Sequence, residues 1–308
     1  MNNIVKKCGF ISIIGATNSG KSTLMNAILG IHASIVSHKV QTTRNIIRGI
    51  KNYDNTQLVF IDTPGIFNAV NKFDKAIVKS ATDSFIDCDI ILFVIDVVKG
   101  INKTVLNIIQ KLRNIDKVRN ENLKICAVLN KVDLIHKPKL LGIADNLNVL
   151  FNFDNIFMVS AYKNDGIDDV VKACVDYSPQ SNWFYDNEVL DISNSLYYAE
   201  ITREQVYKFL HKEIPYDISV ITENIKEENN ILEIRQIIYV SRVSQRKIVI
   251  GDKAEIVKLI GSRSRQMLQN ITGQKVRLFL TVKVQADWKN KKEFYDELGL
   301  EFPFTEDE

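Results

Sequence analysis

The sequence predicts an α/β amino-terminal half, built on a mostly parallel sheet with helices on both faces, followed by a smaller α+β unit. Apolar runs alternate with amphipathic stretches up to about residue 176, the pattern lapses over residues 177–195, and mixed periodicity returns from residue 196. A chain of 308 residues with 45% hydrophobic content is long enough for about two domains, each with its own core.

Five apolar runs in the first half are predicted to be buried strands: FISIIG, LVFIDTP, DIILFVID, ICAVLNKVD and IFMVSA. Amphipathic stretches such as 21–30 and 104–112 predict helices between them. Several of the runs end in polar motifs. Because ligands bind at the carboxyl ends of parallel strands, we expect the chemistry of this half to gather there.

The stretch 177–195 holds the only Ser-Pro pair and is predicted to be a linker between a first domain, 1–176, and a second, 196–292. In the second we expect a helix near 199–211, extended segments near 217–225 and 232–243, a turn at GDKA and a helix near 255–271. In the last strand, one face is shared by Val276, Leu278, Leu280, Val282 and Val284. Residues 293–308 carry acids and no bases, which predicts an acidic tail.

Charge is distributed unevenly along the chain. Residues 235–292 contain 14 Lys/Arg against 3 Asp/Glu, an excess of +11 within a total of +3, so the remainder carries −8. A basic block in an otherwise acidic chain favours a polyanionic partner, and nucleic acid rather than membrane because the charges are spread over strands and helices. The alternative is a solvated basic surface without a partner.

No targeting segment is predicted. The most apolar run, 90–98, is interrupted by Asp96 and is shorter than the roughly 20 residues that a membrane helix needs. The four cysteines are dispersed without metal-binding or disulfide-framework spacing, which predicts a reducing cytosol as the location.

The segment GATNSGKS, Gly15–Ser22, matches the phosphate-binding pattern G-x-x-x-x-G-K-[ST] between a predicted strand and a predicted helix. Backbone N–H groups of such a loop face phosphates, Lys21 supplies a positive charge to them, and Ser22 offers a hydroxyl to Mg²⁺. The candidate phosphate-binding residues are Gly15, Ala16, Thr17, Asn18, Ser19, Gly20, Lys21, Ser22 and Thr23.

Three further motifs follow in an order that strengthens this prediction. Asp62 ends a strand, as does the acid that holds Mg²⁺ through its water shell, and the Gly65 N–H is available to a γ-phosphate. The acceptor carboxylate of Asp133 suits the N1–H and amino donors of guanine, which favours GTP over ATP. A backbone N–H near Ser160 is expected to support the base. The candidate residues are Asp62, Thr63, Pro64, Gly65, Ile66, Asn130, Lys131, Asp133, Ser160 and Ala161.

The segment QTTRN, 41–45, has no clear periodicity and lies between the phosphate loop and Asp62. A threonine here that reaches Mg²⁺ only when the γ-phosphate is present would make the segment a switch. Thr43 is favoured, with Thr42 as the alternative. The predicted metal-binding residues are therefore Ser22, Thr43 and Asp62.

On these motifs the chain resembles the Era family of bacterial GTPases. The resemblance extends over nearly the whole chain and rests on GATNSGKST, QTTR, DTPG, NKVD, EIPY and the stretch from IGDKAEIVKLIG to VKVQADW. It implies a P-loop G domain followed by a type II KH domain. It also implies hydrolysis of GTP to GDP with Mg²⁺, binding to the 3′ end of small-subunit (16S) rRNA, and assistance in late assembly of the 30S subunit.

The residue after Gly65 is Ile66, whereas Ras-like enzymes have a glutamine there that orients the attacking water. Members of the resembled family also carry a hydrophobic residue at this position. Related GTPases use K⁺ held by a P-loop asparagine, which corresponds to Asn18, so the predicted catalytic residues are Lys21, Asn18 and Thr43. The alternative for Asn18 is a residue that only shapes the turn.

KH domains clamp a single strand through a GxxG loop. Here the loop is Gly251-Asp252-Lys253-Ala254, which departs from the family pattern through Ala254 and adds an acid at its second position. Trp288 is a candidate for stacking on a base, with core packing as the alternative. The predicted RNA-binding residues are Gly251, Asp252, Lys253, Ala254, Arg242, Arg246, Lys247, Lys258 and Trp288.

Two other functions fit parts of the same pattern. One is a non-catalytic, GTP-gated RNA-binding module. The other is a signalling GTPase that associates peripherally with the inner membrane through the basic block. A monomeric, cytoplasmic GTPase with the 30S subunit as its partner is the function that we favour.

Overall fold

The computed structural model describes residues 5–36, 43–44, 46–65, 72–83, 88–118, 122–187 and 190–302. Contacts divide the chain into two compact units. The first comprises Met1–Ser34, Thr43–Val70 and Ile77–Asp191, and the second Ile35–Thr42, Asn71–Ala76 and Ile192–Glu308. The boundary between the last segments of the two units, after Asp191, lies inside the predicted linker, 177–195. The two units are described separately below.

A mostly parallel sheet forms the first unit, as predicted. Its strand order is β6-β5-β4-β1-β3-β2-β7. The neighbours from β6 to β3 run parallel, and β2 runs antiparallel to both β3 and β7. The strands are β1 (Lys7–Gly15), β2 (Ile47–Tyr53), β3 (Thr56–Asp62), β4 (Ile90–Asp96), β5 (Lys124–Asn130), β6 (Asn155–Val159) and β7 (Leu190–Asp191).

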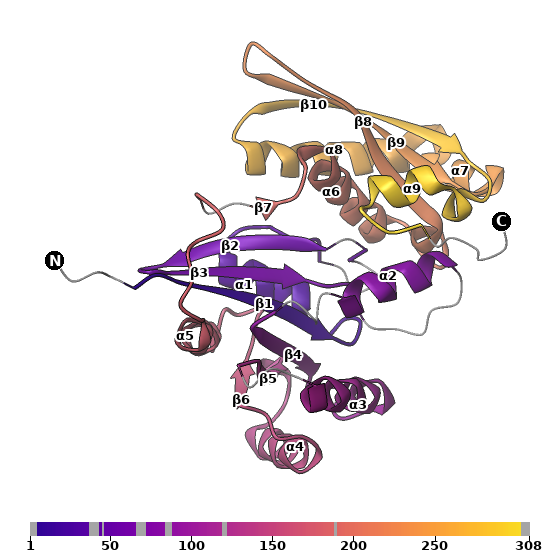
Figure 1. Ribbon diagram of the computed structural model, residues 1–308. Coiled ribbons are helices and arrows are strands. Elements are labelled where there is room, and N and C mark those ends of the chain that lie inside the picture. Colours follow the sequence, from indigo (N-terminus) through magenta and orange to yellow (C-terminus); the bar gives the residue numbers. More distant parts are fainter. Residues whose placement is uncertain are drawn as a thin grey trace, which may run out of the picture. The chain divides into compact units, whose positions relative to one another are not determined.

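Helices cover this sheet because its central strands are apolar on both faces. Ile91, Phe93 and Ile95 of β4 join a core cluster with side chains of α3 and α4, which lie beside β4 and β5 in Figure 1. The intervening Ile90 and Leu92 are equally buried, so the other face of β4 is covered too. The helices of this unit are α1 (Lys21–Leu29), α3 (Lys103–Val118), α4 (Lys137–Leu150) and α5 (Ile167–Tyr177). The helix α2 (Lys72–Asp83) is divided between the two units after Ala76.

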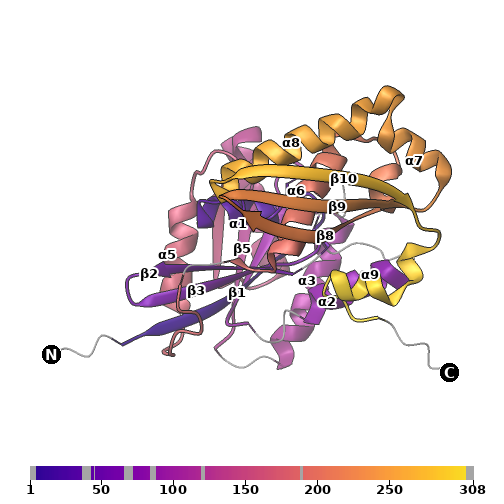
Figure 2. The same cartoon turned by 90° about the horizontal axis from the view of Figure 1, so that it is seen from above.

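The second unit is the predicted α+β unit. Figure 2 shows its three strands side by side in the order β10-β9-β8, with β9 antiparallel to β8 and parallel to β10. Ala199, Val206, Ile238 and Val249 belong to its core cluster. Its elements are α6 (Asn194–Phe209), β8 (Ile218–Glu228), β9 (Ile231–Val240), α7 (Val243–Ile250), α8 (Glu255–Thr272), β10 (Lys275–Val284) and α9 (Lys292–Glu297). Short 3-10 turns lie at Val132–Leu134 (η1), Ile214–Asp217 (η2), Asp252–Ala254 (η3) and Trp288–Asn290 (η4).

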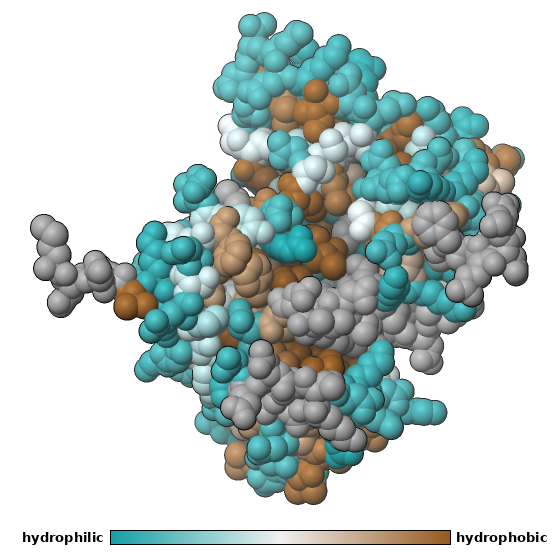
Figure 3. Space-filling model, viewed as in Figure 1, coloured by the Kyte–Doolittle hydropathy of each residue, from teal (hydrophilic) through white to brown (hydrophobic). Residues whose placement is uncertain are grey.

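Charge in the second unit is divided between its elements. The exposed β8–β9 end carries Lys226, Glu227 and Glu228, and the surface seen there in Figure 3 is mainly hydrophilic. Most basic residues of the 235–292 block lie on α7, α8, β10 and the turn after it, while Arg235 lies on β9 and Lys226 on β8. The basic excess is therefore presented by a part of the unit that also holds the Gly251–Ala254 loop.

Several elements were not in the predicted set, including β7 inside the predicted linker. The predicted strand at 232–243 ends at Val240, and its last residues instead begin α7, because Arg242 has extended backbone angles and its N–H bonds to Gln245 Oε1 at 3.0 Å. The antiparallel β2 was not predicted, and part of the predicted acidic tail forms α9. Among the helices that the structure describes, none combines the length and apolar character needed to cross a membrane.

Candidate nucleotide site and nucleic-acid interface

The nucleotide motifs lie at one edge of the first unit's sheet. The phosphate loop follows β1, DTPG begins at the end of β3, NKVD at the end of β5, and Ser160-Ala161 follow β6. These four strands are parallel, so their carboxyl ends bring the loops to the same edge. The fold thus unites residues that are up to 146 positions apart in the sequence, between Gly15 and Ala161.

Close backbone approach explains the second glycine of the phosphate loop. The φ angle of Gly20 is 99°, and a Cβ built on it would lie 2.1 Å from Nδ2 of Asn130. That amide donates to the Ser19 carbonyl oxygen at 2.9 Å. A side chain at position 20 would therefore displace the asparagine that ties β5 to the phosphate loop.

Lys21 is buried at the start of α1. Its Nζ donates to the carbonyl oxygens of Gly15 at 3.2 Å and Ala16 at 3.0 Å. Burial lowers the pKa of its ammonium to about 8, while the charge of Asp62 acts in the opposite direction. The two carbonyls hold a cation whose hydration has been removed, and such a cation gains strongly from a phosphate oxygen.

The three predicted metal-binding residues come together. The Ser22 hydroxyl donates to Asp62 Oδ2 at 2.7 Å and lies 3.0 Å from Thr43 Oγ1. Thr43 thus lies beside Ser22, its contact with Mg²⁺ stays a prediction, and Thr42 lies outside the described residues. Burial raises the pKa of the Asp62 carboxyl, against the effect of Lys21 and the neighbouring hydroxyls.

This group fits a magnesium ion. Asp62 is fully buried, and its Oδ1 has no hydrogen-bond partner among the described residues. A buried carboxylate oxygen without a donor is costly unless a ligand completes it. Hard cations such as Mg²⁺ take oxygen ligands, and Ser22, Thr43 and Asp62 offer only oxygen.

The DTPG turn approaches the phosphate loop closely. A Cβ on Gly65 would lie 2.8 Å from Thr17 Cγ2 and 3.2 Å from Lys21 Nζ. The Thr63 hydroxyl donates to the Ile13 carbonyl oxygen at 2.8 Å, which fixes the turn to β1. Gly65 therefore lies next to the lysine that would meet a γ-phosphate. Ile66 lies outside the described residues.

Lys131 links the base motif to the phosphate loop. Its Nζ donates to the Asn18 carbonyl oxygen at 2.8 Å and forms an ion pair with Asp96 Oδ2 at 2.6 Å. Asn18 has a φ of 63°, a left-handed conformation that asparagine tolerates, so it shapes the turn of the loop. The sequence prediction did not include Asp96, although an acid ending the most apolar run of the chain was a usable signal.

Asp133, in η1, has a carboxylate that neighbouring side chains orient. Ser160 Oγ donates to its Oδ1 at 2.7 Å, and Lys163 Nζ lies 4.0 Å from its Oδ2. The Ala161 N–H donates to Asn130 Oδ1 at 3.1 Å. In this structure that N–H orients Asn130, and the expected contact of Ala161 with a base stays a prediction.

A cavity of about 460 Å³ lies between α1 and the loop that follows β6. One wall comes from α1 and the turn after it, including Thr23, Asn26 and His32, and the other from Ala161 and Tyr162. Its volume lies within the range of small-molecule pockets. Its lining contains Ala161 but none of Gly15–Ser22, Asn130 or Asp133, so it adjoins the predicted nucleotide site without coinciding with it.

In the second unit, the GDKA loop joins α7 to α8. Gly251 has φ 74° and ψ 175°, and Lys253 and Ala254 have φ values of 46° and 61°. All three angles are positive, so the backbone forms a tight turn with Lys253 exposed. Arg242, Arg246 and Lys247 of the preceding helix region are exposed too. Lys258 Nζ donates to the Lys253 carbonyl oxygen at 3.3 Å.

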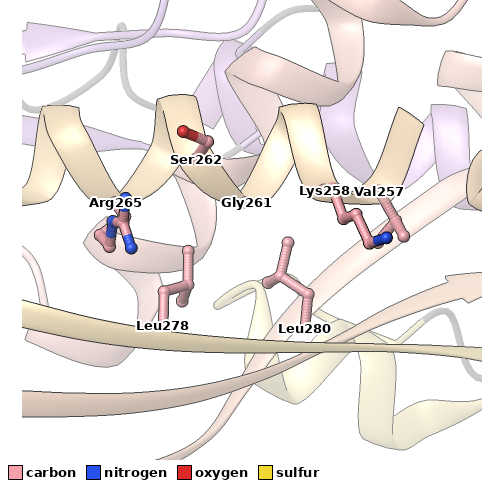
Figure 4. Close-up of a pocket in the computed structure, with 7 residues that line it drawn as sticks. All are labelled: Val257, Lys258, Gly261, Ser262, Arg265, Leu278 and Leu280. Carbon is pink, nitrogen blue, oxygen red and sulfur yellow. The ribbon is translucent and has the colours of Figure 1, made fainter. Parts of the chain in front are cut away.

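A groove of about 300 Å³ continues from this loop between α8 and β10. Figure 4 shows Leu278 and Leu280 pointing from the strand toward the helix, where Gly261 leaves the surface bare. Lys258 and Arg265 line the same groove. Lys258 was predicted. Gly261, Ser262 and Arg265 were not, although their spacing of three, four and seven residues from Lys258 places them on one helix face.

Trp288 is not available to stack on a base, which corrects that prediction. Its side chain is fully buried, its Nε1 donates to the Asp217 carbonyl oxygen at 3.3 Å, and its ring lies 5.4 Å from the Phe294 ring. Core packing, the alternative, is what the structure shows. The misleading signal was the group of three lysines after it: Lys289 lies in η4, Lys291 between η4 and α9, and Lys292 in α9.

Together these features define a class: a P-loop GTP-binding domain joined to a KH domain. The family model described as 50S ribosome-binding GTPase matches residues 10–131, and the KH domain model matches residues 213–289. The two matched ranges contain the phosphate loop and the GDKA loop respectively.

The chain belongs to the Era family of GTPases. It is 42% identical over 299 residues to GTPase Era of Brucella suis biovar 1, covering 96% of this chain and 94% of that one. It is 41% identical over 297 residues to GTPase Era of Mesorhizobium japonicum, with the same coverage of both chains.

Two solved structures are similar over nearly the whole chain. One is a variant of Aquifex aeolicus Era bound to GDP·AlF4−, with a TM-score of 0.89, 33% identity, and coverage of 95% of this chain and 99% of that one. The other is Era with MgGDPNP and nucleotides 1506–1542 of 16S ribosomal RNA, with a TM-score of 0.89, 34% identity, and coverage of 96% and 99%.

Proposed function

We propose that this Era-family GTPase is a molecular switch that hydrolyses GTP and binds the 3′ end of 16S rRNA during late assembly of the 30S subunit. The observation that carries the proposal is the joint presence, in one chain, of the buried Lys21–Ser22–Asp62 group and the GDKA loop with its groove. The Era complex that contains both MgGDPNP and 16S RNA supports the same pairing of ligands.

The candidate site residues of the first unit have different parts in binding GTP. Lys21 and the loop N–H groups bind the phosphates, Asp133 accepts from guanine, and Gly65 meets the γ-phosphate. Bound Mg²⁺ supplies positive charge between the β- and γ-phosphates, and Ser22, Thr43 and Asp62 are the residues that hold it. Thr43 lies within hydrogen-bond distance of Ser22, so a segment that carries it responds to the ligand of the same site.

The RNA half of the proposal rests on the loop and the groove. The positive φ angles of the GDKA loop make a tight turn that a phosphodiester can approach, and Lys258 connects the turn to the groove. Leu278 and Leu280 give the groove an apolar wall suited to base faces, while Arg265 offers a cation for the backbone. A single strand fits this arrangement better than a duplex does.

The full chain should bind an oligonucleotide of the 16S 3′ end more tightly than a scrambled strand of the same length. Fluorescence titration over a salt series should give a log-log slope of about −0.7 for each phosphate contacted. Equal binding of both strands would reduce the second unit to a general polyanion surface. Preference for anionic vesicles over RNA would support the membrane alternative to a cytoplasmic monomer.

We further propose that K⁺ supports hydrolysis through the side-chain oxygen of Asn18. Turnover of GTP should be about tenfold faster in K⁺ than in Na⁺ at equal ionic strength, since about 1.4 kcal/mol of transition-state stabilisation is a factor of ten. Asn18→Ala should remove most of the difference, and Ile66→Gln should not be needed for activity.

The control for this experiment is nucleotide affinity, which should change little between the two salts. Equal turnover in both salts would exclude the role of K⁺. No turnover in either salt, with GTP still bound, would favour the non-catalytic RNA-binding module.

A further inference from the structure

Ser34 is a buried residue of the nucleotide site that the sequence motifs do not include. Its hydroxyl donates to Asp62 Oδ2 at 2.7 Å, and its exposed fraction is 1%. The Ser22 hydroxyl donates to the same oxygen, also at 2.7 Å. Asp62 Oδ2 therefore receives hydroxyl donors from two different segments, the start of α1 and the loop after it.

Asn26, a half-buried residue of α1, holds Ser34 in place. Its Oδ1 accepts from the N–H groups of Ala33 at 2.9 Å and Ser34 at 2.8 Å, and its Nδ2 donates to the Ser34 carbonyl oxygen at 2.7 Å. One side-chain amide thus satisfies three backbone groups of the loop. This fixes the loop because losing any of these bonds would leave a partly buried polar group without a partner.

The effect falls on the orientation of the Asp62 carboxylate. With two donors on Oδ2, rotation of the carboxylate would break two charge-assisted hydrogen bonds at once. The other oxygen, Oδ1, is the buried one that has no donor among the described residues. It is consequently held as the acceptor for whatever completes the site.

We propose that Asn26 and Ser34 are positioning residues for the metal: Asn26 fixes the loop, and the Ser34 hydroxyl fixes Asp62 for Mg²⁺. This inference rests on the proposed nucleotide site. A positioning role affects binding of the nucleotide with its metal and leaves binding of the nucleotide alone unchanged. A merely structural role would weaken both equally.

The test uses the full chain and a fluorescent GDP analogue, titrated in EDTA and over a graded Mg²⁺ series. Ser34→Ala should raise the Mg²⁺ concentration for half-maximal enhancement of affinity about tenfold, the scale of one hydrogen bond to a charged group. Its affinity in EDTA should equal that of the parent. Ser34→Thr, which keeps the hydroxyl, should restore most of the parent's Mg²⁺ dependence.

Ser12→Ala is the matched control. Ser12 is a fully buried serine of β1 whose hydroxyl has no partner among the described residues, so its loss should leave the Mg²⁺ dependence unchanged. Asn26→Asp keeps the acceptor for Ala33 and Ser34 but places an oxygen against the Ser34 carbonyl. It should shift the Mg²⁺ dependence in the same direction as Ser34→Ala.

The outcomes separate the inference from the proposed function. Parent-like Mg²⁺ dependence in Ser34→Ala would overturn the inference, and so would an equal loss of affinity in EDTA and in Mg²⁺. Failure of the parent itself to bind GDP more tightly with Mg²⁺ would instead overturn the proposed nucleotide site.

Discussion

Asp133→Asn should reduce the affinity for GTP on the order of 100-fold and create binding of xanthosine triphosphate. The Ser160 hydroxyl donates to Oδ1 of Asp133, so an asparagine is expected to keep its oxygen there and present its amide nitrogen where Oδ2 now lies. That nitrogen faces the guanine donors as a second donor, which costs a charged hydrogen bond and leaves polar groups unpaired. Xanthine has an oxygen at C2, and this oxygen accepts a hydrogen bond from the asparagine amide nitrogen.

Competition titration against a fluorescent GDP analogue measures both changes. Asp165→Asn is the matched control, since it removes the same charge from an exposed side chain only five residues after Ser160. It should keep the guanine preference of the parent. An unchanged guanine preference in Asp133→Asn would remove Asp133 from the base site.

Gly251→Asp should weaken RNA binding by at least about tenfold while GTP binding stays at the parent value. A Cβ at position 251 would lie 2.7 Å from Ile256 Cγ1 and 3.0 Å from the Ile256 nitrogen, and the backbone there, at φ 74° and ψ 175°, is accessible almost only to glycine. The strain is of order 1–3 kcal/mol, and the new charge repels the phosphodiester as well.

Two variants separate charge from geometry. Asn230→Asp adds the same charge in the β8–β9 turn, where the φ of 59° suits either residue, and should affect RNA binding little. Ala254→Gly should preserve or tighten binding, because Ala254 has a φ of 61° that glycine adopts without strain. RNA affinity of Gly251→Asp equal to that of the parent would exclude this loop as the clamp.

The parallel strands and the nucleotide motifs were predictable because each signal is local. The strands that end in Asp62 and Asn130 each combine an apolar run with a nucleotide motif within a few consecutive residues, so both the buried strand and the binding residues could be predicted. In the second domain the three strands and the helices α6 and α8 were predictable from periodicity over longer windows, whereas α7 and α9 were not. The motifs and the periodic elements both depend only on the spacing of residues within one continuous stretch of sequence.

The features that escaped prediction depend on contacts between distant segments. Ser34 matters through its bond to Asp62, which leaves no pattern in the sequence around Ser34. Asp96 matters through Lys131, and its position at the end of an apolar run marked it without indicating this partner. The burial of Trp288 depends on Asp217 and Phe294, which surround it only in the folded unit. One tryptophan near lysines in the sequence does not show whether its ring is exposed for stacking or buried in the core.

The ties between the base motif and the phosphate loop have a consequence for selectivity. Asn130 bonds to Ser19 and Lys131 to Asn18, so two consecutive residues after β5 brace two consecutive residues of the loop. The residues that recognise the base and the loop that binds the phosphates are therefore expected to move as one rigid frame. A nucleotide with the wrong base disturbs the frame as well as its own contacts, so its penalty exceeds the sum of the hydrogen bonds that it fails to make.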